Sequence, residues 1–177
     1  MGEAEMGRFL TFLPMLLVLA AGPGFSADAG DPAAKAIEGC LASYDAAAMQ
    51  EKADGAPLKG ATSYCTDKFF EACAEGRGWT QSAMNECQGE ATGYWMGQVR
   101  QRMAAVKALG SPEIDKWLEE SAASFEAYRK VRCDRFDMTQ GTMYVAIKEG
   151  CETDMARERA EDLDDFLGSE PLIAKPE

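Results

Sequence analysis

The six cysteines carry the most informative chemistry of this 177-residue chain, because the chain contains no histidine. Without histidine, a serine or cysteine nucleophile has no imidazole base, and a mixed zinc site cannot be completed. Successive cysteines are separated by 25, 8, 14, 46 and 18 residues, so no C-x-x-C pair occurs. We therefore expect three disulfides, with no zinc site and no reactive thiolate.

The pairing of these cysteines is open from sequence alone, since six cysteines permit fifteen connectivities. Pairs close in sequence would each join two successive helices across their connection, and closing such loops stabilises a fold by about 2 to 4 kcal/mol. We favour the sequence-local pairs Cys40 with Cys65, Cys73 with Cys87, and Cys133 with Cys151.

Carboxylates are the other groups that could do chemistry. Glu119 with Glu120, or Asp162 with Asp164 and Asp165, could act as a general acid and base. They fall on the polar faces or at the ends of predicted amphipathic helices, where solvated charge explains them. The chain also has no D-x-D-x-D-G calcium loop. We therefore expect a protein that is not an enzyme and that needs no metal or cofactor.

Signals for helix starts and ends occur throughout the chain, so the cysteines and carboxylates are expected to lie on or beside helices. Capping residues and glycines bound five predicted helices, which begin near residues 31, 62, 80, 111 and 142, the second being capped by Thr62 or Ser63. Gly110 is expected to end the longest helix in a left-handed conformation. No segment alternates like a strand. The predicted class is all-α, a small disulfide-stapled bundle with three longer helices and one or two shorter N-terminal ones.

Apolar side chains spaced by three or four residues predict the buried face of each longer helix. The predicted core positions are Met84, Ala91, Trp95, Val99, Met103 and Val106, then Ile114, Trp117, Leu118, Phe125 and Tyr128, and finally Met143, Ile147, Cys151, Met155, Leu163 and Phe166.

The N-terminal segment predicts export. Thirteen mostly apolar residues (9–21) follow Arg8 and precede small residues, which is the layout of a signal peptide and is shorter than the roughly 20 residues of a membrane span. We expect cleavage after Ser26 or Ala29, a mature domain over residues 27–168, a flexible tail at 169–177, and a periplasmic or secreted location without a stable membrane anchor. A retained N-terminal anchor is the alternative.

The charge of the chain limits its partners. With 30 acidic and 18 basic side chains the formal net charge is −12, which argues against nucleic acid and favours a cationic protein partner. Acidity that only keeps an exported protein soluble is the alternative.

Four segments carry a family resemblance: TQSAMNEC at Thr80–Cys87, FEAYRKVRC at Phe125–Cys133, GTM at Gly141–Met143, and C-x-x-x-M-x-x-x-R-x-x-x-L over Cys151–Leu163. In this order and spacing, residues 73–163 resemble the LprI-like lysozyme-inhibitor domain of bacterial envelope proteins. Residues 31–72 would then be an N-terminal extension of the domain. The resemblance implies lysozyme as the cationic partner.

Two functional hypotheses follow. The first is an exported binding protein that inhibits lysozyme by occluding its cleft, and the alternative is a structural or stress-related periplasmic interaction module with no effect on lysozyme. The candidate contact residues are Asp134, Asp137 and Gln140, in the connection DRFDMTQG between the last two cysteines. A purely polar connection, in which Asp137 or Thr139 caps the last helix, is the competing interpretation.

Overall fold

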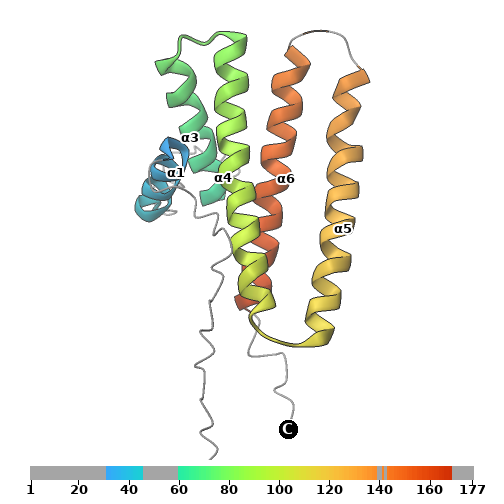
Figure 1. The fold of residues 1–177 in the computed structure, drawn as a ribbon. Helices are drawn as coiled ribbons and strands as arrows, with labels where there is room; N and C mark the ends of the chain where they lie inside the picture. Colours follow the sequence, from blue (N-terminus) through green and yellow to red (C-terminus); the bar gives the residue numbers. More distant parts are fainter. Residues whose placement is uncertain (1–30, 46–59, 139–140, 142, 169–177) are drawn as a thin grey trace, which may run out of the picture.

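The protein is a row of helices in the computed structural model, which describes residues 31–45, 60–138, 141 and 143–168 (Figure 1). These residues contain no strand, so the predicted all-α class is confirmed. The expected signal peptide and tail lie outside the described residues. The elements are α1 (Pro32–Ser43), α3 (Ala61–Gly76), α4 (Gln81–Lys107), α5 (Pro112–Asp134), the short 3₁₀ helix η1 (Arg135–Met138) and α6 (Met143–Gly168).

The long helices lie side by side in the order α3, α4, α6, α5, with α1 against α3 (Figure 1). Helices α4 and α6 run in the same direction and form the most extensive contact of the fold. Thr92 Oγ1 lies 2.7 Å from Thr153 Oγ1, and Arg102 Nε lies 2.6 Å from Asp164 Oδ1, so the two helices keep one register over several turns. No helix in the described part of the chain is long and apolar enough to cross a membrane.

Most helix starts follow the predicted caps. Asp31 Oδ1 accepts a hydrogen bond from the Ala33 N–H at 2.9 Å, and Thr80 Oγ1 accepts one from the Ala83 N–H at 3.1 Å. These bonds satisfy backbone donors that a helix start leaves without a partner. Gly110 has φ +73°, the left-handed conformation expected at the end of α4.

The predicted cap of the second helix is wrong. Helix α3 begins at Ala61, and Gly60 at its N-cap offers no side-chain acceptor. The Thr62 hydroxyl instead donates to Glu161 Oε1 of α6. A tertiary hydrogen bond therefore takes the side chain that local sequence assigns to the cap.

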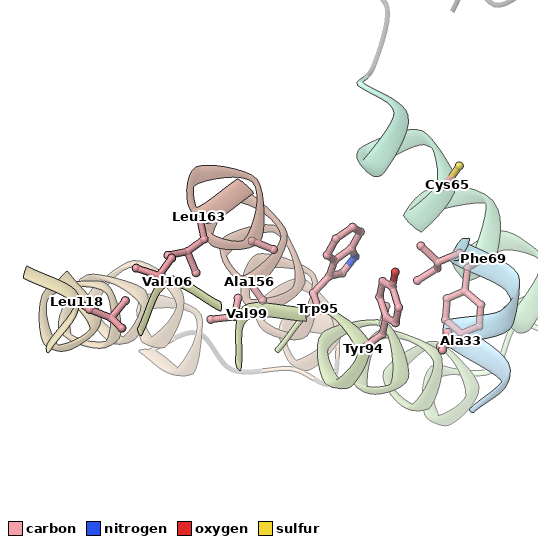
Figure 2. Close-up of a cluster of buried hydrophobic side chains, with 14 residues drawn as sticks. Ala33, Cys65, Phe69, Tyr94, Trp95, Val99, Val106, Leu118, Ala156 and Leu163 are labelled. Carbon is pink, nitrogen blue, oxygen red and sulfur yellow. The ribbon is translucent and has the colours of Figure 1, made fainter. Parts of the chain in front are cut away.

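The core lies where α4 meets α6 on one side and α1 and α3 on the other (Figure 2). Trp95 is its largest fully buried side chain, and its indole N–H donates to Thr66 Oγ1 at 2.9 Å. The predicted stripe of α4 is confirmed at Ala91, Trp95, Val99 and Val106, while Met84 and Met103 are only partly buried.

The predicted core positions hold only in part in α5: Leu118 is buried and Ile114 packs partly buried against the core, but Cys133 is the only other buried residue of the helix. Trp117 is 38% exposed and Tyr128 is 58% exposed. Helix α5 stands at the edge of the row, on the side of α6 away from α1 and α3, so only one of its faces is covered (Figure 1).

The same expectation fails at the start of α6. Met155 is buried, but Ile147 is 39% exposed and Met143 is 59% exposed. Each step of four residues turns a helix about 40° beyond a full circle, because a helix has 3.6 residues per turn. Positions spaced strictly by four therefore rotate out of the core toward the start of α6.

The cysteines form three disulfides that connect successive long elements. The bonds join α1 to α3, α3 to α4, and α5 to α6, and their Cα atoms are 5.6 to 5.9 Å apart. The pairs are Cys40 with Cys65, Cys73 with Cys87 and Cys133 with Cys151, which is the sequence-local pairing.

Candidate protein-binding surface

The turn from α5 to α6 is closed by the Cys133–Cys151 disulfide, and it contains the residues that sequence nominates for contact. Cys133 is fully buried at the end of α5, and η1 follows directly as a single 3₁₀ turn. Gly141, with φ +132°, then leads into α6. The disulfide therefore ties a short exposed turn to the body of the fold on both sides.

Asp134 and Asp137 are brought together by a lysine. Lys148 Nζ lies 2.6 Å from Asp137 Oδ2 and 3.1 Å from Asp134 Oδ1. The hydrogen bonds that Lys148 donates to these carboxylates, first to Asp137 and then to Asp134, raise the pKa of Lys148 above its ordinary value. The side chain of Asp137 is 60% exposed and that of Asp134 is 38% exposed, so a partner can reach them, but Lys148 of α6 offsets one of their two charges. Gln140 and Thr139 lie outside the described residues.

Exposed apolar side chains surround this ion cluster, and sequence reasoning missed them. Met138 in η1 is 81% exposed, Val131 in the last turns of α5 is 76% exposed, and Met143 at the start of α6 is 59% exposed. Large exposed apolar groups of this kind mark interaction surfaces when they gather in one region. Phe136 and Met138, two apolar residues within a largely polar connection, were the available signal.

A shallow cleft of about 420 Å³ lies between α5 and α6 beside the turn. Arg129 bridges it, with Nη2 2.8 Å from Glu126 and Nη1 3.3 Å from Glu152. The hydrogen bonds that Arg129 donates to Glu126 raise the pKa of Arg129, so this guanidinium stays charged. The cleft is a salt-bridged hollow, and its lining residues are Glu126, Ala127, Arg129, Lys130, Asp134 and Glu152.

The carboxylates considered for acid–base chemistry are exposed and partly paired. Glu120 lies 3.9 Å from Lys116 on the outer face of α5, next to exposed Glu119. Asp164 pairs with Arg102, while Asp162 and Asp165 are exposed on α6. Among the residues that the structure describes, no group of three potential metal ligands comes together.

Arg159 joins α5 to α6 through contacts that sequence did not suggest. It is 8% exposed, and its Nη2 donates to Ser121 Oγ at 2.7 Å. Its guanidinium carbon lies 5.9 Å from the ring centres of Trp117 and Phe125. Burial lowers the pKa of Arg159, and the two aromatic rings lie within the range of cation–π attraction to its guanidinium.

The comparisons with known proteins agree with this arrangement. The family model described as lysozyme inhibitor LprI matches residues 73–163, just over half of the chain. No curated protein and no solved structure gives a significant match. The match covers α4, α5 and most of α6, together with the disulfides Cys73–Cys87 and Cys133–Cys151. This chain belongs to the LprI family of lysozyme inhibitors.

Proposed function

We propose that this chain is an exported protein that binds lysozyme and inhibits it by placing the α5–α6 turn over the enzyme's cleft. Family membership supports a lysozyme-binding role. The observation that carries the choice of surface is Met138, which is 81% exposed on a turn held between two disulfide-linked helices. Because the disulfide tethers the turn, its backbone loses less conformational freedom on binding than an untethered loop would.

Electrostatics favours the approach of a cationic enzyme. The chain carries a formal net charge of −12, so a basic lysozyme is attracted over a distance set by the ionic strength. The Debye length is about 30 Å at 0.01 M salt and about 8 Å at 0.15 M salt, so association slows as salt rises. The paired Asp134 and Asp137 contribute less than free carboxylates would, because Lys148 balances them.

The location is part of the same proposal. Three disulfides require an oxidising compartment, and the apolar segment at residues 9–21 has the layout of an export signal. We propose a periplasmic or secreted protein in which residues 27–168 form the mature domain. A structural module of the envelope without lysozyme activity remains the competing function.

Titration of lysozyme activity with the purified chain tests the proposal. Inhibition by the wild type should weaken as the salt concentration rises. Met138→Ser should lower the affinity for lysozyme by about tenfold, as expected for the loss of a moderate anchor residue. Asp134→Lys with Asp137→Lys should abolish inhibition, because three like charges would then crowd the turn. Asp165→Lys is the matched control, since Asp165 is an exposed carboxylate near the opposite end of α6. Absence of any complex with c-type and g-type lysozymes at low salt would leave the envelope-module function.

A further inference from the structure

Trp79 has a conformation that its side chain does not favour. Its φ is +55°, and it is the one residue other than glycine with positive φ among those the structure describes. In this left-handed region the Cβ atom crowds the following carbonyl, so a bulky residue there is strained. The residue follows Gly78, with φ +83°, in the turn between α3 and α4.

The turn holds this side chain in place without covering it. The Trp79 N–H donates to the Ala74 carbonyl at 2.9 Å, and the Cys73–Cys87 disulfide closes the turn. The indole meets the ring of Phe70 edge-on, with centroids 6.1 Å apart, yet 51% of Trp79 is exposed. The structure therefore presents a tryptophan in a fixed position on a strained backbone, and strain of this kind gathers at functional sites.

The α3–α4 turn, which contains Trp79, lies at the same end of the molecule as the end of α5 and the start of α6 (Figure 1). A disulfide closes each of the two turns at this end, whereas none closes the Gly110 turn at the opposite end. All but one of the exposed large apolar side chains in the described residues lie in these turns or in the adjoining helical turns. They are Trp79, Tyr128, Val131, Met138, Met143, Val145 and Ile147, and the exception is Trp117.

The charge around Trp79 points to the chemistry of its partner. Between residues 67 and 90 the chain has five acidic and two basic side chains, and Glu75 and Glu86 are exposed beside the turn. Arg77 pairs with Glu86 at 3.4 Å and with Glu90 at 2.7 Å. Because one arginine offsets only one of these two carboxylates, the α3–α4 turn keeps a net negative charge. An aromatic anchor with an acidic rim complements an apolar pocket within a cationic protein surface.

We propose that Trp79 is a second anchor of the lysozyme-binding surface, inserted into an apolar pocket whose surroundings on the partner are basic. The inference rests on the proposed function and extends it from one turn to two. Tryptophan is the residue that most often dominates the binding energy of an interface, and such anchors are surrounded by contacts that exclude water. The α5–α6 turn and the α3–α4 turn would contact the same lysozyme molecule.

The variant Trp79→Gly separates binding from folding, because glycine adopts positive φ without strain. We expect its affinity for a purified c-type lysozyme, measured by calorimetry, to fall at least about 30-fold. Its Tm should stay within a few degrees of the wild type, since relief of strain offsets the lost contact with Phe70. Trp117→Ala is the control: it removes a half-exposed tryptophan stacked on Phe166 near the other end, so Tm should fall while affinity is unchanged.

The outcomes are distinguishable. If the wild type binds lysozyme and Trp79→Gly binds within about twofold, the second anchor is wrong and the proposed function stands. If the wild type binds neither c-type nor g-type lysozyme, the proposed function and the second anchor are both wrong. Sedimentation and phosphatidylcholine vesicles test other occupants: dimerisation or vesicle binding that Trp79→Gly abolishes would assign Trp79 to a second copy of the chain or to lipid, and would overturn the inference.

Discussion

Removal of the Cys133–Cys151 disulfide, by Cys133→Ala with Cys151→Ala, should release the end of α5. The bond closes a loop of 18 residues, for which the chain-entropy relation gives a loss of about 3 kcal/mol in the free energy of unfolding. Little else holds this end, because Leu118 and Cys133 are the only buried residues of α5. The pairs of Arg129 and Arg132 with α6 are partly exposed and contribute at most about 1 kcal/mol each.

Urea denaturation and amide hydrogen exchange measure both parts of this prediction. The free energy of unfolding should fall by about 3 kcal/mol. Amides in the last turns of α5 should exchange through a local opening with little urea dependence, while those of α4 keep the steep dependence of global unfolding. The control is Cys40→Ala with Cys65→Ala, which removes a disulfide that does not touch α5. A loss below about 1 kcal/mol, or one shared urea dependence for α4 and α5, would refute the reasoning.

Three further perturbations test the fold. Thr66→Val should cost about 1 to 3 kcal/mol in urea denaturation, because it leaves the buried indole N–H of Trp95 without an acceptor; a neutral result would contradict that bond. Gly110→Ala should lower the free energy of unfolding by about 1 kcal/mol, because Gly110 has φ +73°. Gly89→Ala, within α4 and with open space around the new Cβ, should instead raise it by about 0.5 kcal/mol. Equal effects of the two substitutions would contradict the left-handed turn. Burial raises the pKa of Tyr94 to about 12, so its stabilisation is complete below pH 10 and is lost as pH rises toward 12. Between pH 10 and pH 12 the free energy of unfolding of Tyr94→Phe should therefore fall by about 2 kcal/mol less than that of the wild type. Parallel plots of unfolding free energy against pH for the two proteins would refute the burial of the phenol.

Local sequence signals predicted the elements of this fold well, because capping and helix-ending residues act on their own helix. Asp31, Thr80 and Gly110 act as predicted. The failure at Thr62 has a different origin, since its hydroxyl bonds Glu161, which lies 99 residues further along the chain. No local pattern contains that contact.

Burial was predictable only where a helix has neighbours on both sides. The stripe of α4 lies between α6 and α3, so its apolar spacing translates into a buried face. Helix α5 has the same spacing but stands at the edge of the row, where Tyr128 is left exposed. Sequence periodicity states which residues share a face, and the packing of the whole chain decides whether that face is covered.

The turn that sequence nominates for binding stays a prediction, and the structure shows its surroundings. The turn between the last two cysteines is exposed and tethered, as expected. Its aspartates pair with Lys148, which lies in the next helix, and apolar Met138 is 81% exposed. Trp79 had no sequence signal beyond its glycine-flanked turn, because exposure and backbone strain depend on how α3 meets α4.

Inhibition of a c-type lysozyme by the disulfide-intact wild type, titrated at low salt, tests the central claim most directly. The proposed binding surface predicts loss of lysozyme activity that saturates at one inhibitor per enzyme and weakens as salt is raised. Full lysozyme activity in the presence of excess protein at low salt, with no complex detected, would contradict it.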